Sequence, residues 1–287
     1  MTDTIAINPL TDPGATRQRF YAPAWLMEAR QPVSITLIGA GGTGGEVLDQ
    51  LCRLHATLNA LDHPGLSVTL YDGDDVSASN VGRQRFSPME VGQNKAASLI
   101  NRVNLFYGLA WEGVPLYWTP DDGLANLTIS ATDSAALRHQ IAEYGRAERQ
   151  GWHVPHTNKL WLDFGNGEHD GQAILGHLEP ARGGETIRLP HVIDLYPDMK
   201  DDPNDGPSCS VEEAIRQQAF GVNSTLVANA FATLVWPLFR KGSIDRHGLF
   251  MDVEQGIINP LHVDTLEWQF MGYTPPATDA GNSPSMG

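Results

Sequence analysis

Cysteine and basic residues are scarce in this chain of 287 residues. Its two cysteines, Cys52 and Cys209, are too few for a disulfide framework or a four-cysteine zinc site, and they fit a reducing compartment. Lys and Arg total 19 against 34 Asp and Glu, and the resulting formal charge of -15 would repel a nucleic-acid backbone. The composition therefore predicts a cytoplasmic protein without zinc, for which nucleic acid is not the main partner.

Long hydrophobic runs are also missing. No segment reaches the roughly 18 uninterrupted apolar residues of a membrane span. The polar N-terminus MTDTIAINPLTDPG lacks the basic and apolar regions of a signal sequence. With 41% hydrophobic residues, the chain has the composition of a globular protein with one large core. We expect neither a membrane partner nor export.

Short apolar strands alternate with helical stretches from Val33 onward. VSITLIG, the helix GGEVLDQLCRLHATLNAL and LSVTLYD make a βαβ unit, which predicts a parallel sheet. A capping box at Ser87 and Glu90 predicts a helix that continues past Gly92 through NKAASLINRVNLF. The further predicted elements are strands VPLYW, LTISAT and KLWLDFG, a helix over residues 134–150, DGQAILGHL as a candidate antiparallel strand, a helix from Val211 to about Phe239, and a closing hairpin around LFMDVEQGIINPLHV.

These elements predict an α/β fold, a Rossmann-like and mainly parallel sheet flanked by helices, with antiparallel strands near the C-terminus. We expect one domain over residues 33–273. Residues 1–32 are expected to form an N-terminal arm with a short helix within RQRFYAPAWLMEAR, and residues 274–287 a disordered tail. Residues 179–209 are rich in Pro, Gly and Asp and predict a long crossover loop with Cys209 at its end.

The first chemical motif is the glycine-rich turn GAGGTG, directly after a strand and before a helix. Small residues there let main-chain amides approach a nucleotide phosphate. Asp72 ends the next strand, where a carboxylate can accept hydrogen bonds from ribose hydroxyls. These two features fit NAD and ATP equally well. The candidate nucleotide-binding residues of the turn are Gly39, Gly41, Gly42 and Gly44.

The segment after Asp72 separates the two nucleotides. Cleavage between the α- and β-phosphates of ATP builds negative charge on pyrophosphate, which cationic and amide groups stabilise. A dehydrogenase needs no such series. Magnesium is also expected, because it pairs with phosphate oxygens and needs only one or two carboxylates, and Asp133 after LTISAT is well placed. The candidates in this segment are Asp74, Asn80, Arg83, Gln84 and Lys95.

Four motifs taken together, GAGGTGG, LYDGDDVSASNVGRQ, GQNK and SATDS, resemble the ThiF/MoeB/HesA family of ubiquitin-like-protein activating enzymes. Their order and spacing match over about residues 33–170. The later segment DGPSCSVEEAIRQQAFGVN and the final hairpin look most like the ThiF-related proteins of plasmid-type PRTRC cassettes. The paired CxxC motifs that hold structural zinc in better-known members are absent from this sequence.

The resemblance implies ATP-dependent adenylation of the C-terminal carboxylate of a ubiquitin-like protein by a homodimer. It implies that Asp72 holds the ribose, that Asn80, Arg83, Gln84 and Lys95 hold the triphosphate, and that Asp133 holds magnesium or the reacting phosphate. In such relatives an arginine of the partner's arm often reaches the phosphates, and Arg17 or Arg19 is the candidate here.

Cys209 is a candidate nucleophile because Ser210 and Glu213 form a capping box that places its sulfur beside a helix N-terminus. It would take the acyl group as a thioester for transfer to a conjugating-enzyme-like partner; the alternative is a small packed residue. Cys52 lies at helical spacing among leucines and is expected in the core.

Three alternatives stay open. One is adenylation of another carboxylate or amide without a cysteine intermediate, one is an NAD-dependent oxidoreductase, and one is a silent assembly subunit, against which Arg83 and Lys95 argue.

Overall fold

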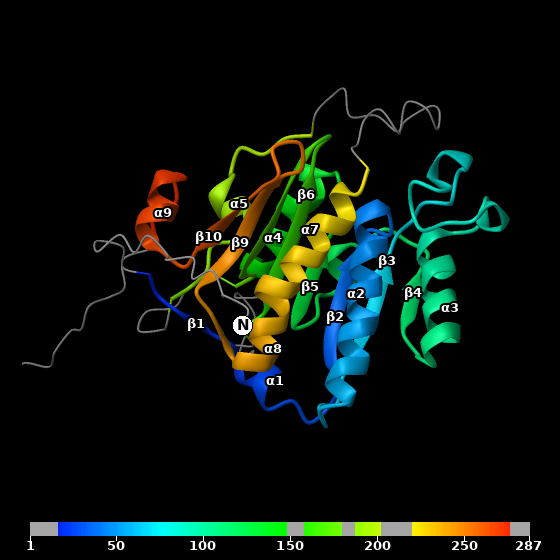
Figure 1. Ribbon diagram of the computed structural model, residues 1–287, viewed down its shortest axis with the longest axis horizontal. Helices are drawn as coiled ribbons and strands as arrows, with labels where there is room; N and C mark the ends of the chain where they lie inside the picture. Colours follow the sequence, from blue (N-terminus) through cyan, green and yellow to red (C-terminus); the bar gives the residue numbers. More distant parts are fainter. Residues whose placement is uncertain (1–16, 148–157, 180–186, 202–219, 276–287) are drawn as a thin grey trace, which may run out of the picture.

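The computed structural model describes residues 17–147, 158–179, 187–201 and 220–275. Its centre is an eight-stranded mixed sheet in the order β10-β9-β7-β6-β5-β2-β3-β4 (Figure 1). The strands are β2 Val33–Ile38, β3 Leu66–Tyr71, β4 Glu112–Val114, β5 Leu127–Ser130, β6 Leu160–Asn166, β7 Asp170–His177, β9 Arg246–Asp252 and β10 Ile257–His262. The α/β fold predicted from the sequence is confirmed.

Strands β2 to β6 form the parallel half of the sheet. Most residues of these strands are buried, because helices cover both faces of this half of the sheet. Figure 1 shows α2 and α7 on one face and α4 on the other. The connecting helices are α2 Gly42–Asn59, α3 Lys95–Tyr107 and α4 Ala135–Ala147.

The strand order reverses between β2 and β5. From β2 the chain proceeds outward to β3 and β4, then returns to the other side of β2 to form β5 and β6. The carboxyl ends of the two central strands stay tied together, since the Ala131 amide donates to the Ile38 carbonyl at 2.9 Å. In open α/β sheets, ligands bind in the crevice outside such a reversal. The topology therefore places a site above Ile38 and Ala131.

The other half of the sheet is antiparallel. β7 runs antiparallel to both β6 and β9, and β9 forms a hairpin with β10, so the antiparallel strands predicted from the sequence are confirmed. A continuous helix over Val222–Lys241 lies across this half as α7 Val222–Ala230, a π turn Phe231–Val235 and α8 Trp236–Lys241. This helix is long and apolar enough to span a membrane, but its buried face packs on the sheet, as a core helix does.

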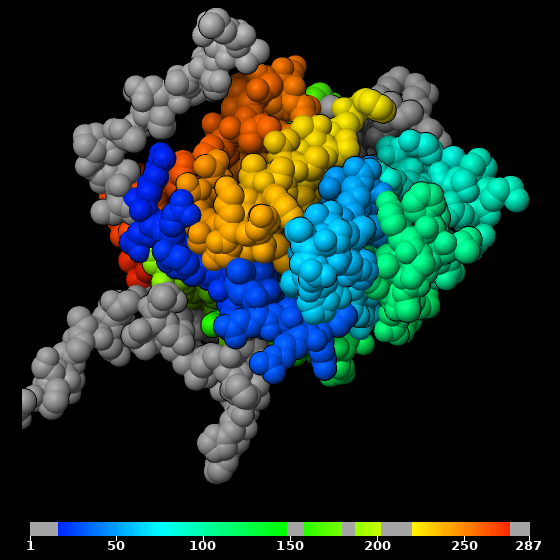
Figure 2. All heavy atoms as spheres, turned by 60° about the horizontal axis from the view of Figure 1, so that its bottom comes forward, coloured from blue at the N-terminus to red at the C-terminus, as the bar shows by residue number. Residues whose placement is uncertain are grey.

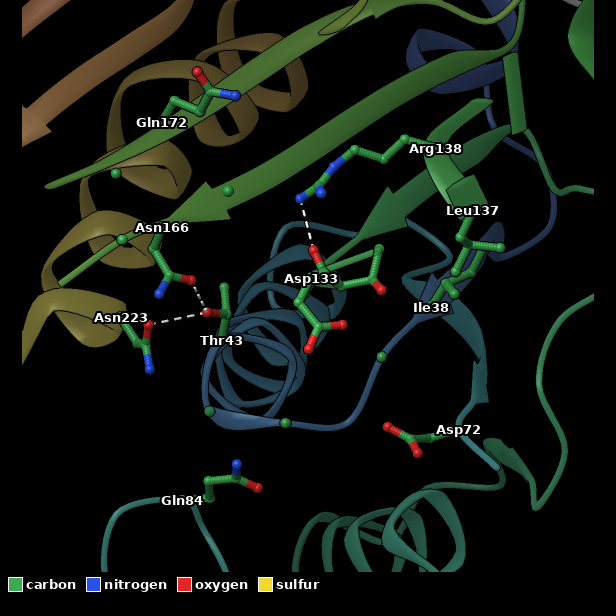
Figure 3. A pocket seen from close by; sticks show the side chains of 18 of the residues that line it. Ile38, Thr43, Asp72, Gln84, Asp133, Leu137, Arg138, Asn166, Gln172 and Asn223 are labelled. Atoms are coloured by element: carbon green, nitrogen blue, oxygen red, sulfur yellow. Dashed lines mark hydrogen bonds between the residues drawn. The ribbon is translucent and has the colours of Figure 1, made fainter. Parts of the chain in front are cut away.

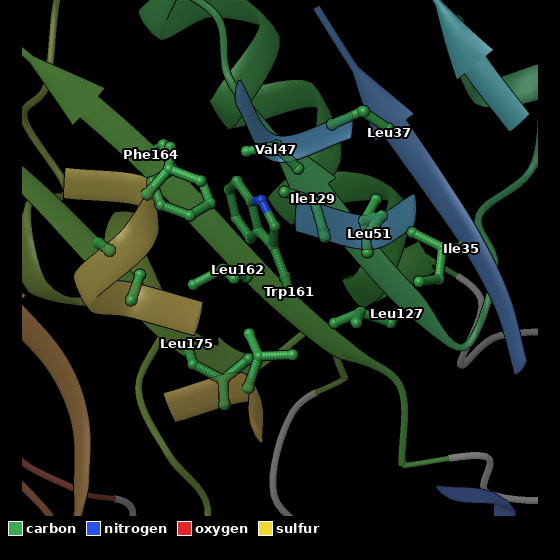
Figure 4. Packing of buried hydrophobic residues seen from close by; sticks show 14 of the residues in the cluster. Ile35, Leu37, Val47, Leu51, Leu127, Ile129, Trp161, Leu162, Phe164 and Leu175 are labelled. Carbon is green, nitrogen blue, oxygen red and sulfur yellow. The ribbon is translucent and has the colours of Figure 1, made fainter. Parts of the chain in front are cut away.

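The hydrophobic core lies between the sheet and these helices (Figure 4). Trp161, Phe164 and Ile129 project from β5 and β6 and are at most 1% exposed. Cys52 is also buried in this core, and burial raises the pKa of its thiol to about 12. The prediction that Cys52 is a core residue is confirmed.

The N-terminal segment packs against the C-terminal half of the chain. Strand β1 Phe20–Tyr21 pairs with β8 Ser243–Ile244, and the short helix α1 Ala24–Met27 follows. Figure 2 shows this segment, in blue, beside α8, in orange. The arm residues from 17 onward are thus part of the fold, and the predicted short helix is present.

Several predicted elements differ in extent. The predicted helix from Ser87 is two elements, a 3₁₀ turn over Pro88–Glu90 with the expected capping box and a separate α3, because Gly92 adopts a φ of 85°. The predicted strand VPLYW is replaced by β4, which ends at Val114, because Pro115 has no amide to donate.

Two short helices were not expected, α5 Val192–Leu195 within the predicted loop and α9 Thr265–Phe270 after the hairpin. Residues 202–219, which include Cys209 and the start of the predicted helix at Val211, lie outside the described residues, as does most of the predicted tail.

Candidate functional site

The glycine turn after β2 has a conformation that side chains would prevent. Gly39 has a φ of 98°, in the region that favours glycine, and a Cβ there would overlap the Ala131 carbonyl. A Cβ at Gly44 would overlap the Gly39 carbonyl. Both glycines therefore let the turn fold tightly onto the first turn of α2. The helix N-terminus, with its free amides, faces the crevice above β2 and β5.

Asp72 connects the end of β3 with this turn. Its Oδ2 accepts a hydrogen bond from the Ala40 amide at 2.6 Å, and its Oδ1 accepts one from the Asp74 amide at 2.9 Å. Burial raises the pKa of Asp72, while these two hydrogen bonds and the nearby Lys95 partly offset the shift. Each ionised carboxylate oxygen can accept a second hydrogen bond. Asp72 can therefore hold the turn and accept from a ligand at once.

Lys95 begins α3 and points back toward the end of β3. Its Nζ lies 2.9 Å from Asp74 Oδ2, and the Tyr117 hydroxyl donates to Asp74 Oδ1. Burial alone would raise the pKa of Asp74, but the hydrogen bonds from Tyr117 and Lys95 lower it. The lysine side chain is deeply buried, with an exposed fraction of 11%. A phosphate placed here would compete with Asp74 for the ammonium group.

Arg83 lies in the loop between β3 and α3 and has no such partner. No ion pair or hydrogen bond joins its guanidinium to another described residue, and its Nε is buried. Burial also lowers the pKa of Arg83. An unpaired cation at a cavity wall lowers the free energy of binding an anion more than a paired one does, because no existing contact is lost.

Arg85 and Arg102 hold this loop in place. Arg85 forms two hydrogen bonds with Glu46 of α2 at 2.8 and 3.0 Å. Arg102 of α3 donates to the Arg85 carbonyl and to Glu90, both at 2.7 Å. The loop is thus tied to two helices, which fixes the direction of Arg83.

Asn80 and Gly44 are the two predicted ligands that the described structure leaves out of the cavity wall. Asn80 is buried, and its Oδ1 accepts hydrogen bonds from the amide and hydroxyl of Ser77 at 2.8 and 3.0 Å. It closes a 3₁₀ turn, Ala78–Asn80, that starts the Arg83 loop. In this structure Asn80 therefore shapes the loop rather than facing a ligand, and Gly44 acts through tight packing.

The far wall of the crevice contains a buried ion pair. Arg138 Nε of α4 lies 2.8 Å from Asp163 Oδ1 of β6, and their side chains are 7% and 1% exposed. Asp163 also accepts from the Ser130 hydroxyl at 2.6 Å. Arg138 donates through Nη2 to the Thr132 and Phe164 carbonyls at 2.6 and 2.9 Å. This network holds the ends of β5 and β6 together beside Asp133.

An amide cluster at the start of α2 was not predicted from the sequence. The Thr43 hydroxyl contacts Oδ1 of Asn166 at 2.9 Å and Oδ1 of Asn223 at 3.0 Å (Figure 3). Asn166 ends β6 and Asn223 is the second residue of α7, so the three residues are far apart in the chain. Thr43 lies in the glycine-rich turn, and Asn223 is the last residue of the DGPSCSVEEAIRQQAFGVN segment, but no role was predicted for either. Asn166 is a single polar residue at the end of a strand, a signal too common to interpret.

One cavity of about 900 Å³ lies among these elements. The structure brings nine predicted residues to its wall, namely Gly39, Gly41, Gly42, Asp72, Asp74, Arg83, Gln84, Lys95 and Asp133. The predicted nucleophile, Cys209, lies outside the described residues. Within the described residues, no group of three or more His, Cys, Asp or Glu could hold a metal ion by itself. The carboxylates that line the cavity are Asp72, Asp74, Asp133, Glu168 and Asp170.

This cavity has the chemistry of a polyphosphate site. A helix N-terminus, the guanidinium of Arg83 and the ammonium of Lys95 provide positive charge, and Asp133 lines the same cavity. Gln84 adds an amide whose Oε1 is buried and without a partner among the described residues. The arrangement can bind a nucleoside triphosphate with its ribose at Asp72.

The sequence model of the ThiF family matches residues 24–236 of this chain. No curated protein matches the chain at the sequence level. Among solved structures, E. coli MccB with ATP is 16% identical, with a TM-score of 0.54, and the match covers 90% of this chain and 70% of that one.

Two other structures are similar in the same degree. PaaA is 13% identical with a TM-score of 0.54, covering 81% of this chain and 64% of that one. The microcin C7 biosynthetic enzyme MccB in complex with N-formylated MccA is 16% identical with a TM-score of 0.52, covering 87% and 67%. The chain thus spans about two thirds of the length of these structures, and at such identities the likeness concerns the fold.

Proposed function

We propose that this chain, which belongs to the ThiF family, transfers AMP from ATP to the C-terminal carboxylate of a protein or peptide. The observation that carries the proposal is the guanidinium of Arg83, which has no partner among the described residues and lines the same cavity as Lys95, the glycine turn and Asp72. An NAD-dependent oxidoreductase would use the turn and Asp72 but has no need for two cations around a third phosphate.

The reaction balances without a general base. A carboxylate oxygen of the substrate attacks the α-phosphorus of ATP, and the bond between that phosphorus and the bridging oxygen of the β-phosphate breaks. The products are the acyl adenylate and pyrophosphate, which leaves with the bonding electron pair. Arg83 and Lys95 stabilise the charge that develops on the pyrophosphate, and the fixed cavity wall aligns the two reactants.

ATP and magnesium fit the residues present. Arg83 Nε and Gln84 Oε1 are buried without a partner among the described residues, and phosphate oxygens and water would supply such partners. Asp133 would bind magnesium together with phosphate oxygens. A bound magnesium ion would neutralise charge on the triphosphate; Arg83 and Lys95 would still orient it.

ATP-dependent exchange of labelled pyrophosphate tests the proposal directly, with candidate carboxylate proteins as substrates. Protection against thermal unfolding provides a second measurement that needs no acyl substrate. ATP with magnesium should raise the melting temperature while NAD should not. Protection by NAD alone would instead support the oxidoreductase.

We further propose that the substrate is a ubiquitin-like protein and that Cys209 then accepts its acyl group as a thioester. The sequence context of Cys209 and the resemblance to activating enzymes of the PRTRC type support this step. The thiolate would attack the acyl carbon, and AMP would leave. The thioester would pass to a conjugating-enzyme-like partner. A homodimer would allow Arg17 to reach the phosphates of its partner; Arg19 would first have to leave Ser243 of its own chain, to which it donates at 3.0 Å.

The cysteine step has its own test. Cys209→Ala should keep pyrophosphate exchange and abolish the adduct with the ubiquitin-like protein that reducing agents release. Cys52→Ala is the matched control, because Cys52 is buried in the core and should leave the adduct intact. An adduct that survives Cys209→Ala would refute the thioester.

A second candidate is adenylation of a peptide acid without a cysteine intermediate. The solved MccB complex with ATP and the complex with N-formylated MccA favour it, because that enzyme shares the fold and is seen with a peptide. Pyrophosphate exchange that depends on a peptide, with no adduct at Cys209, would establish this candidate.

A further inference from the structure

Tyr117 lines the cavity three residues after the end of β4, and no step of the proposed reaction uses it. Its hydroxyl donates to Asp74 Oδ1, while Lys95 Nζ lies 2.9 Å from Asp74 Oδ2. The three side chains come from segments that follow β3, precede β4 and follow β4, and Figure 1 shows β3, β4 and α3 together at one edge of the sheet. Asp74 therefore has an uncharged donor on one oxygen and a cation on the other.

The position of Tyr117 is set by its neighbours. The adjacent Trp118 is buried and donates through Nε1 to the Gly123 carbonyl at 2.8 Å, which anchors the segment after β4. The Tyr117 ring lies against the main chain of Gly73, where a Cβ would come within 2.7 Å of ring Cδ2. Because Tyr117 is 67% exposed, apolar burial alone does not account for this placement. The hydrogen bond to Asp74 is the polar contact that the placement makes possible.

The Tyr117 hydroxyl stays protonated at neutral pH and is therefore a permanent donor to Asp74. The hydrogen bond to Asp74, and then the negative charge of that carboxylate, raise the pKa of Tyr117 to about 12. An uncharged donor can hold a carboxylate without pairing with phosphate as strongly as lysine or arginine would. Tyr117 can thus stabilise Asp74 while leaving the phosphates to the cations of the cavity.

Binding of a triphosphate would change the partners of Asp74. When Lys95 turns to a phosphate, Asp74 loses the cation that it contacts among the described residues. The two main chains stay joined, since the Lys95 amide donates to the Asp74 carbonyl at 2.9 Å, so the exchange needs side-chain rotation only. A carboxylate without a partner beside the phosphates opposes binding. A retained hydrogen bond from Tyr117 lowers that cost, and it strengthens once the ammonium group has left.

We infer that Tyr117 is a positioning residue for ATP: it holds Asp74 while Lys95 exchanges that carboxylate for the phosphates of the nucleotide. The inference rests on the proposed adenylation and adds to it a residue that acts through Asp74 rather than on the reacting atoms. Removal of the Tyr117 hydroxyl therefore weakens triphosphate binding. Removal of the Asp74 charge makes that hydroxyl dispensable.

Calorimetric titration of the full chain with ATP and magnesium tests this inference. Tyr117→Phe keeps the ring and should raise the Kd by roughly three- to tenfold, the share of a hydrogen bond to a charged group that differs between the two states. Gly73→Ala should fold, because the exposed ring can swing outward, and should raise the Kd similarly by displacing the hydroxyl. Tyr21→Phe is the matched control, because Tyr21 is 65% exposed on β1 and does not line the cavity.

A double-mutant cycle with Asp74→Asn shows whether Tyr117 acts through Asp74. Asp74→Asn alone should bind ATP with magnesium at least as tightly as the unsubstituted chain, because the phosphates no longer compete with a carboxylate for Lys95. Tyr117→Phe added to Asp74→Asn should change the Kd by less than about twofold. A role of Tyr117 in packing alone would give the same loss in both backgrounds.

The outcomes separate this inference from the proposed function. An unchanged Kd in Tyr117→Phe, equal losses with and without Asp74, or weaker binding by Asp74→Asn alone would overturn the role of Tyr117 while the proposed adenylation stands. Failure of the unsubstituted chain to bind ATP with magnesium would overturn the proposed function, and this inference with it.

Discussion

The cavity wall and the antiparallel half of the sheet differ in whether buried polar atoms have hydrogen-bond partners. In the antiparallel half, His247 is fully buried, and its ring contacts the Leu175 carbonyl through Nδ1 at 2.8 Å while its Nε2 accepts from the Trp268 indole at 2.8 Å. At the cavity, Arg83 and Gln84 have buried polar atoms without a partner among the described residues.

This difference separates stability from ligand binding. An unpaired buried polar atom costs free energy in the folded protein, and a bound ligand recovers that cost. Substitutions in the antiparallel half should therefore alter unfolding, and substitutions at the cavity wall should alter catalysis. Arg138 belongs to both categories, because it supports the sheet through Asp163 and also faces the cavity.

Loss of Arg138 should give the largest effect on stability. Arg138→Met removes the charge opposite Asp163, which is not exposed, and should lower the free energy of unfolding by about 3–5 kcal/mol. Urea denaturation measures this loss. The double variant Arg138→Met/Asp163→Leu should recover most of that stability, because it removes both charges. If the double variant is no more stable than the single one, the loss comes from packing rather than charge.

Arg83→Met should have the next largest effect, and it should be catalytic. Pyrophosphate exchange should fall by roughly 10²–10³-fold, because the developing charge loses a fixed cation. The melting temperature should stay the same or rise slightly, since the guanidinium has no partner to lose among the described residues. Arg53→Met is the matched control, because Arg53 pairs with Asp49 on the exposed side of α2 and does not line the cavity. Equal losses of exchange in both variants would contradict this assignment.

Acid should destabilise the antiparallel half through its buried histidines. Burial lowers the pKa of His191 and His247 to about 4 and that of His177 to about 3. Below the ordinary value of about 6.5 the unfolded chain binds more protons than the folded one, so stability falls as pH drops from there toward about 4. Above about pH 7 these groups contribute no pH dependence.

The acid effect should be on the order of 2 kcal/mol for each of His191 and His247 between about pH 7 and about pH 5. Urea denaturation across this range measures it. His247→Gln should reduce the slope of stability against pH by about one proton, whereas His169→Gln, at an exposed histidine, should leave it unchanged. An unchanged slope in His247→Gln would show that this ring takes up no proton on unfolding.

The parallel half could be predicted from the sequence because each of its elements leaves a local pattern. Apolar runs such as LWLDFG indicate buried strands, and the glycines of the turn indicate close approach of the main chain. Strand pairings within the antiparallel half depend on residues about 80 positions apart, as in the pairing of Gln172 with Phe250, and no local pattern encodes them. The hairpin was predictable only because its two strands are adjacent.

Among the site residues, too, those that lie close together in the sequence could be predicted and those from distant elements could not. Arg83, Lys95 and Asp72 were found because they lie in one continuous motif, whereas Asn166 and Asn223 reach Thr43 from distant elements. Asn80 lies in the motif but turns inward to cap Ser77, since a short polar side chain beside a 3₁₀ turn can accept from its own backbone. Sequence position identified the loop correctly but not the direction of every side chain in it.

Substitution of Asn94, the residue just before α3, gives the smallest predicted effect on stability. Asn94 ends the preceding turn, accepts from the Ala97 amide at 3.0 Å, and donates to the Asp72 and Asp74 carbonyls at 2.8 and 3.0 Å. Asn94→Ala should lower the free energy of unfolding by about 1 kcal/mol, since it removes a helix N-cap.

Because Lys95 is the next residue, Asn94→Ala should also raise the KM for ATP in pyrophosphate exchange more than it lowers kcat. Asn101→Ala, on the exposed side of α3, should change neither stability nor KM. Loss of stability without any change in KM would show that the cap supports the helix alone, and that the position of Lys95 is set by Asp74 instead.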